Sequence, residues 1–165
     1  MKRLANLFVT LVFLAVGGGT VASPVTTTST LNSDLALKLA TATRAACRAK
    51  DLQVTVAVVD RSGLLQVLLR DQLAGNFTVR IAELKAATAA GFRQATLGLN
   101  GQLTARSELR SLDRRADILM VGGGVPVEYN GQVVGAIGVS GAPTPDGDHD
   151  CAVAGIEALA DELLF

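Results

Sequence analysis

The sequence is poor in the residues that build metal centres and nucleic-acid platforms. Its 165 residues include no Trp, one Tyr, two Cys and one His. These numbers exclude a zinc site with several His and Cys ligands, and they exclude an aromatic platform on which single-stranded bases stack. An excess of positive charge is also missing, because 15 basic residues balance 15 acidic ones. Nucleic-acid-binding proteins usually carry such an excess. We therefore expect neither a metal centre nor a nucleic-acid partner.

Apolar residues are plentiful, at 49% of the chain, and many of them lie at the N-terminus. Lys2 and Arg3 precede an apolar run from Leu4 to Val16, and small residues follow up to Ala22. This order is typical of a secretory signal peptide. The run is short for a membrane span, which needs about 20 apolar residues. We expect residues 1–22 to be a signal peptide and the mature protein to be periplasmic or extracellular, with no membrane span. An uncleaved anchor is the alternative.

Removal of residues 1–22 would change the charge balance. The mature chain would hold 13 basic and 15 acidic residues, and all 13 basic residues precede residue 116. Eight acidic residues and no basic residue follow Arg115. Such a polarised sequence either forms a polarised surface or interleaves its two halves in the fold.

Hydrophobic periodicity divides the rest of the chain into a lead-in and one domain. Residues 23–30 are rich in Thr and Ser and predict a flexible lead-in. Residues 31–165 predict a single α+β domain with a mainly antiparallel, five-stranded sheet, on which the N- and C-terminal helices pack. The expected helices are 32–50, 78–96, 102–112 and 149–164. The expected strands are 54–59, 64–70, 118–121, 125–129 and 132–140, the last two joined by an Asn-Gly turn.

Three motifs occur in a recognisable order. They are the segment Val56–Gly63, the lysine-containing and alanine-rich segment Ala82–Ala89, and a glycine-rich stretch that runs from Gly122 through Gly135–Ala142 to Gly155. In this order and spacing they resemble the GlcG/HbpS family, a haem-degrading or haem-binding domain that also occurs at the C-terminus of PduO-type proteins. The resemblance covers roughly residues 31–164.

The resemblance implies a profilin-like fold and homo-oligomers built from dimers. Members include secreted haem-binding proteins that act with a sensor kinase and domains of corrinoid-linked proteins. We therefore expect an exported, oligomeric protein that binds haem or a related tetrapyrrole, for sensing, storage or protection. One alternative is an enzyme that acts on haem, a corrinoid or a small organic acid. Another is an interaction module for an envelope sensor protein. A binding protein is favoured over an enzyme, because one histidine and many hydroxyls do not by themselves make a catalytic triad.

Haem iron needs an axial ligand, usually His, Met, Cys or Tyr. The mature chain offers His149, Met120, Tyr129, Cys47 and Cys151. His149 is otherwise an exposed residue in the first turn of the last helix. Met120 is otherwise a core residue in an apolar strand. Tyr129 lies beside the Asn-Gly turn, where we expect it to be exposed.

Two basic residues on the expected 78–96 helix, Arg80 and Lys85, are candidates to meet haem propionates. Lys85 matches the lysine of the family motif, but it could equally cap a carbonyl group or pair with an acid. Gly122, Gly123 and Gly124 are candidates to present backbone N–H groups to an anion. The alternative for these glycines is a bent strand or the close approach of another backbone.

Cys47 lies on the first expected helix and Cys151 near the start of the last. If these helices are neighbours, a disulfide can join them. Two buried thiols are the alternative.

Overall fold

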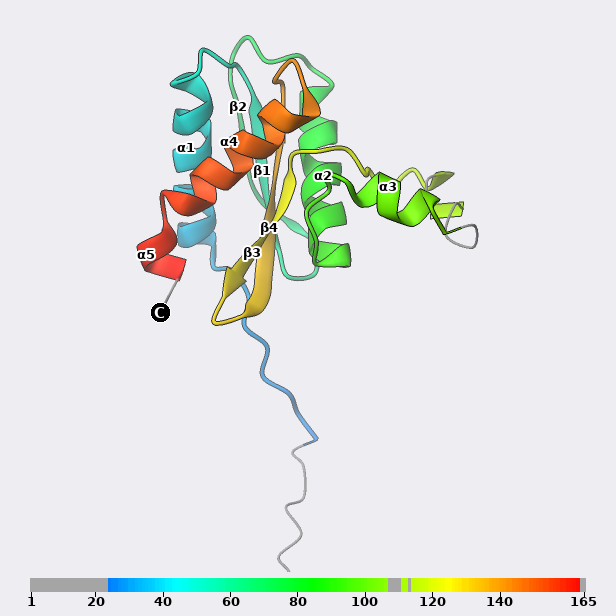
Figure 1. The fold of residues 1–165 in the computed structure, drawn as a ribbon. Helices are drawn as coiled ribbons and strands as arrows, with labels where there is room; N and C mark the ends of the chain where they lie inside the picture. Colours follow the sequence, from blue (N-terminus) through cyan, green and yellow to red (C-terminus); the bar gives the residue numbers. More distant parts are fainter. Residues whose placement is uncertain (1–23, 107–110, 113, 164–165) are drawn as a thin grey trace, which may run out of the picture.

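A four-stranded antiparallel sheet forms the middle layer of the protein (Figure 1). The computed structural model describes residues 24–106, 111–112 and 114–163, so the predicted signal peptide lies outside the described residues. The sheet order is β2-β1-β4-β3, and each neighbouring pair is antiparallel. The strands are β1 (Thr55–Asp60), β2 (Leu65–Arg70), β3 (Gly124–Tyr129) and β4 (Gln132–Ser140).

Helices cover both faces of the sheet, as Figure 1 shows. One face carries α1 and α4, and the other carries α2. The bounds are α1 (Ser33–Arg48), α2 (Thr78–Phe92), α3 (Leu99–Thr104), α4 (Pro145–Glu157) and α5 (Ala160–Leu163). The predicted α+β class, the antiparallel sheet and the packing of the first and last long helices on one face are confirmed.

The alternating side chains of β1 explain the two layers, because successive residues of a strand point to opposite faces. Val56 and Val58 belong to the core cluster shared with α1 and α4, whereas Ala57 and Val59 belong to the cluster shared with α2. The α2 cluster consists mostly of alanines, so α2 lies very close to the sheet. A Cβ atom added to Gly138 would lie 2.7 Å from the backbone nitrogen of Ala86, so this position on β4 requires glycine.

The predicted fifth strand, 118–121, is wrong, since this segment forms no ladder within the described chain. The N–H of Leu119 donates instead to Thr88 Oγ1 on α2, at 2.9 Å. The N–H of Ile118 donates to the carbonyl of Arg115. The apolar composition of 118–121 therefore predicted the burial of Met120 but not the hydrogen-bond partners of the segment.

Several predicted helix boundaries also need correction. The expected helix 102–112 is α3, which lies earlier, at Leu99–Thr104, and the expected last helix is divided into α4 and α5. The last long helix begins at Pro145 and not at 149, because Thr144 caps it by accepting a hydrogen bond from the N–H of Gly147. Proline is well suited to this first helical position, where its missing N–H costs nothing. The helix on the opposite face ends at Phe92 and not at 96, because Arg93 adopts a left-handed conformation with φ of 53°.

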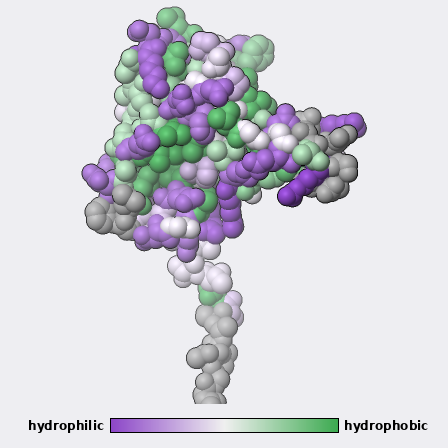
Figure 2. Space-filling view, viewed as in Figure 1, coloured by the Kyte–Doolittle hydropathy of each residue, from purple (hydrophilic) through white to green (hydrophobic). Residues whose placement is uncertain are grey.

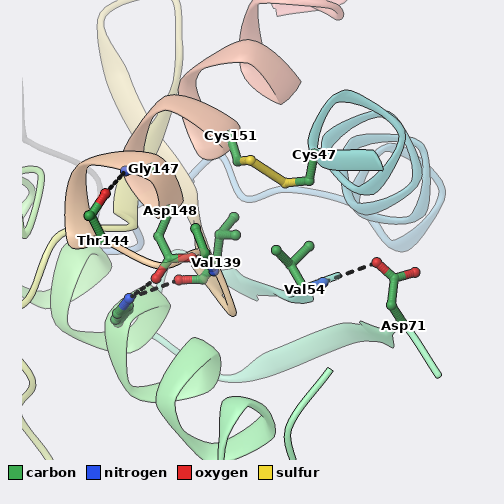
Figure 3. Close-up of a disulfide and its surroundings, with 10 residues drawn as sticks. Cys47, Val54, Asp71, Val139, Thr144, Gly147, Asp148 and Cys151 are labelled. Carbon is green, nitrogen blue, oxygen red and sulfur yellow. Dashed lines mark hydrogen bonds and ion pairs between the residues drawn. A yellow bond between two sulfur atoms is a disulfide. The ribbon is translucent and has the colours of Figure 1, made fainter. Parts of the chain in front are cut away.

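A disulfide joins Cys47 on α1 to Cys151 on α4 (Figure 3). Their Cα atoms lie 5.4 Å apart, within the usual range for a disulfide. Both cysteines are fully buried. The sequence left open either a disulfide or two buried thiols, and the structure has the disulfide.

The basic and acidic halves of the sequence are interleaved. Lys38 on α1 pairs with Glu162 on α5, with 2.7 Å between Nζ and Oε2. Lys85 on α2 pairs with Asp148 on α4, also at 2.7 Å. Within the described residues, no helix is long and apolar enough to cross a membrane.

Candidate functional site

A buried ion pair lies where α2, the end of β4 and the start of α4 meet. Lys85 is 2% exposed and Asp148 is 4% exposed. Lys85 Nζ donates to Asp148 Oδ2 at 2.7 Å and to the carbonyl of Val139 at 3.0 Å (Figure 3). The other carboxylate oxygen, Asp148 Oδ1, accepts a hydrogen bond from the N–H of Ala142 at 2.8 Å. Both carboxylate oxygens are thus satisfied, and the pair fixes the loop between β4 and α4.

The glycine run beside this pair allows the backbone to come close. A Cβ atom on Gly123 would lie 2.8 Å from the Cβ of Asp148 and 3.0 Å from Lys85 Nζ, and its φ is +118°. A Cβ atom on Gly122 would lie 2.7 Å from the carbonyl oxygen of Pro145. The N–H of Gly124 donates to Thr96 Oγ1 at 2.8 Å. The run therefore provides close backbone approach, and the N–H of Gly124 is already engaged within the protein.

A pocket of about 290 Å³, open to solvent, lies against the ion pair, and we call it the Lys85 pocket. Its polar residues include Lys85, Asp148 and the buried Ser140. The rest of its wall is mainly apolar. The complete lining is Ile81, Lys85, Leu119, Val121, Ser140, Ala142, Pro143, Thr144, Pro145 and Asp148.

Burial raises the pKa of the Asp148 carboxyl group above its ordinary value of 3.8. The hydrogen bonds from Lys85 and from the N–H of Ala142 oppose this change, and burial outweighs them. A raised pKa in the folded state means that the carboxyl group binds its proton more tightly there than in the unfolded chain. Its contribution to stability is therefore complete below pH 3.8 and is lost as the pH rises through the folded-state pKa.

We expect the carboxyl carbon of Asp148 to titrate at a pH above 3.8, the ordinary value for an aspartate. Carbon-13 NMR of the side-chain carboxyl groups across pH 2.5–7 measures this. The free energy of unfolding of the natural protein, relative to an Asp148→Asn variant, should fall over the same pH interval. A midpoint below 3.8 would show that the ion pair, and not burial, dominates at Asp148.

A second cavity lies at the N-terminal end of the domain, and we call it the lead-in crevice. It has a volume of about 540 Å³, and Leu31, Leu35, Val134 and Leu163 supply its apolar wall. The half-buried side chain of Tyr129 also lines it. Its complete lining is Thr28, Ser29, Thr30, Leu31, Asn32, Leu35, Tyr129, Val134, Glu162 and Leu163.

The edge of the lead-in crevice carries a basic residue. Glu162, which lines the crevice, pairs with Lys38 through an exposed ion pair, with side-chain exposures of 46% and 58%. Exposed pairs of this kind contribute little to stability, so Lys38 can exchange Glu162 for another anion at low cost. An apolar wall, a phenol and an exchangeable lysine therefore occur together at this cavity.

The candidate residues proposed from the sequence do not form one site. Lys85 and Asp148 line the Lys85 pocket, where Lys85 is engaged in its ion pair, whereas the glycines approach the ion pair without lining that pocket. Arg80 projects from α2 with its side chain 62% exposed and pairs with Glu83 at 2.9 Å. Met120 is 7% exposed, and it is absent from the lining of the Lys85 pocket although both its neighbours belong to that lining.

His149 is half-buried and not exposed as expected, and its Nδ1 atom is buried without a hydrogen-bond partner among the described residues. Sequence reasoning missed Lys38 as a site residue and placed Tyr129 at the surface. The position of Tyr129 beside a hairpin turn gave no indication of the cavity that it lines together with the lead-in, because the lining residues are about 100 positions apart. The sequence offered one signal for Tyr129 as a site residue, which is that it is the single tyrosine of the chain.

Comparison with known families and structures gives a consistent result. A family model described as "Haem degrading protein HbpS-like" matches residues 31–157. An uncharacterised 15.0 kDa protein of Citrobacter freundii, from a dhaT-dhaS intergenic region, is 33% identical over 115 residues, which are 68% of this chain and 81% of that protein.

Solved structures share the fold. A double mutant of Streptomyces reticuli HbpS is 34% identical, with a TM-score of 0.75 over 91% of this chain and 98% of that one. The ORFY protein of Klebsiella pneumoniae is 26% identical, with a TM-score of 0.79 over 86% of this chain and 98% of that one. A PduOC–haem complex is 25% identical, with a TM-score of 0.70 over 78% of this chain and 94% of that one.

Proposed function

Because the chain belongs to the HbpS-like family, we propose that it is an exported protein that binds haem or a related tetrapyrrole for sensing, storage or protection. The observation that carries this proposal is the likeness to a haem complex over 78% of the chain, together with the family match. Export is supported by the pattern of residues 1–22 and by the bridged cysteines, since disulfides persist in oxidising compartments.

The lead-in crevice fits the chemistry of haem better than the Lys85 pocket does. Its volume is nearly twice as large, and its apolar wall suits a flat macrocycle. Tyr129 would ligate the iron, since tyrosine serves as an axial haem ligand in some proteins. Lys38 would meet a propionate after releasing Glu162. Bound haem would supply an iron centre for redox chemistry or for ligand sensing, and the protein would hold and orient it.

The proposal includes a homo-oligomer, and the surface supports it. Figure 2 shows apolar side chains gathered along the middle of the face on which α4 lies, with hydrophilic side chains around them. On the neighbouring α1, Leu37 is 51% exposed. Contiguous apolar surface bordered by polar residues is typical of protein–protein interfaces.

Titration of the mature protein with hemin tests the proposed function, and a Tyr129→Phe variant tests the site. We expect a saturable shift of the Soret band for the natural protein, and affinity weakened by at least about tenfold for Tyr129→Phe, the scale on which metal sites respond to the loss of supporting groups. Phenylalanine keeps the ring in the crevice and removes only the oxygen.

His149→Ala is the matched variant, because His149 is a candidate iron ligand that does not line the crevice. We expect it to bind hemin as the natural protein does. If His149→Ala loses the Soret shift and Tyr129→Phe keeps it, the iron ligand is His149 and the crevice assignment is wrong. If no protein shows a saturable shift, haem is not the ligand.

A further inference from the structure

The Lys85 pocket has the features of a second, smaller binding site, independent of the haem proposal. We propose that it binds a small uncharged organic molecule, with a carbonyl oxygen directed at Lys85 and Ser140 and a short apolar body between Leu119 and Val121. Its volume of about 290 Å³ lies at the lower end of the range for ligand pockets.

Buried polar groups at the floor of the pocket have hydrogen-bonding capacity to spare. The Lys85 ammonium has three donor hydrogens, and the described residues supply it with two acceptors, Asp148 and Val139. Ser140 is only 5% exposed, and its hydroxyl is not among the fully buried atoms without a partner in the described part of the chain, so the hydroxyl is open to the pocket. Both residues line the pocket. An acceptor oxygen in the pocket could therefore accept from the third hydrogen of Lys85 and from the Ser140 hydroxyl without displacing a protein partner.

Ser140 also faces the correct side of the sheet. It pairs directly with Thr55 of β1, and paired residues point to the same face. Thr55 Oγ1 lies 2.7 Å from Thr78 Oγ1 on α2, so that face is the α2 face. Lys85 belongs to the same helix. The two groups therefore reach the pocket from adjoining elements of one face.

The charge of the floor selects an uncharged ligand. Lys85 and Asp148 compensate one another across 2.7 Å. The start of α4 contributes partial positive charge, and Asp146 in its first turn offsets that charge. A carboxylate ligand would thus bring a second negative charge beside Asp148, and the pocket lining holds no further cation to pair with it. An amide or ketone of the same shape brings no charge.

Butyramide and butyrate are suitable probes because they have the same shape and differ in charge. We expect butyramide, added to the mature protein at pH 7.5, to shift the backbone amide signals of Lys85 and of residues 140–148 in a saturable way. The midpoint should be in the millimolar range, as expected for so small a ligand. Butyrate should bind at least about tenfold more weakly, the scale of leaving a buried charge without a partner.

Three variants locate the site. Ser140→Ala removes one donor and should weaken butyramide binding about fivefold, the scale of a single hydrogen bond. Val121→Phe, at a position that is 39% exposed and tolerant of size, should fill the pocket and abolish saturation. Ser62→Ala, in the exposed turn between β1 and β2, is the control and should bind as the natural protein does.

The proposal is overturned if butyramide gives no saturable shifts, if the shifts lie outside this pocket, or if Val121→Phe leaves them unchanged. Butyrate binding as tightly as butyramide would overturn the uncharged ligand class. Hemin binding at the lead-in crevice should be unaffected by butyramide, so the failure of either proposal can be distinguished from the failure of the other.

Discussion

Replacing Lys85 with methionine is expected to lower the free energy of unfolding by about 3–5 kcal/mol, because it leaves the buried carboxylate of Asp148 without its partner. The effect should appear as a melting temperature lower by roughly 10–20 °C. Methionine replaces the aliphatic part of the lysine side chain and removes the ammonium, so the packing around the aliphatic part changes little. Thermal and urea unfolding followed by circular dichroism measure the difference.

The pH dependence of the stability lost in Lys85→Met distinguishes the effect of the missing charge from the effect of altered packing. Lys85 is one of the groups that hold down the pKa of Asp148, so in Lys85→Met that pKa should rise further. The carboxyl group is then neutral over a wider acidic range, and the deficit of the variant should be smaller at pH 4 than at pH 7. A deficit that is equal at both pH values would mean that lost packing is the cause.

A double variant supplies the matched control. Lys85→Met with Asp148→Asn removes both charges but keeps an oxygen that can accept the N–H of Ala142. We expect it to recover at least half of the stability lost in Lys85→Met, because compensated removal of a buried ion pair is often close to neutral. If the two single effects simply add, the pair does not act as a unit.

The fold could be predicted well from the sequence because its strongest signals are local. Val54–Val59 alternates between two buried layers, and Asn130 and Gly131 both adopt positive φ in the predicted turn between β3 and β4. The prediction of a strand at 118–121 was wrong, because an apolar composition is the same whether a segment joins a sheet or lies against a helix. Only the hydrogen bond from Leu119 to Thr88 decides between them.

The candidate sites were harder to predict, since each depends on contacts between distant parts of the chain. Lys85 was identified from its motif, and pairing with an acid was one of its open alternatives, but its partner lies 63 residues away on α4. The crevice at Tyr129 combines the lead-in, α1 and α5. Hydrophobic periodicity predicts single helices and strands, and it does not predict which of them together line a cavity. The closeness of Cys47 and Cys151, on which one of the two open alternatives depended, needed only the packing of the first and last long helices on one face.

Loss of the Cys47–Cys151 disulfide is expected to lower the free energy of unfolding by about 2–5 kcal/mol. The bridge joins residues 104 positions apart, so it restricts the unfolded chain over most of the domain. Both cysteines are fully buried, and a reductant added to the folded protein should therefore act slowly. Unfolding in urea with a reductant, followed by refolding with the reductant present, gives the reduced state. Urea unfolding curves of the oxidised and reduced proteins then measure the effect.

A Cys47→Ala, Cys151→Ala double variant is the control, and its unfolding curve should not respond to the reductant. Because the bridge acts mainly on the unfolded state, the native site on the same helix should survive its loss. Asp148 lies one turn before Cys151 on α4, and it remains held by Lys85, Ala142 and the Thr144 cap. We therefore expect the reduced protein to unfold at lower urea yet to bind butyramide with unchanged affinity. If affinity falls together with stability, the disulfide positions α4 in the folded state and does more than restrict the unfolded chain.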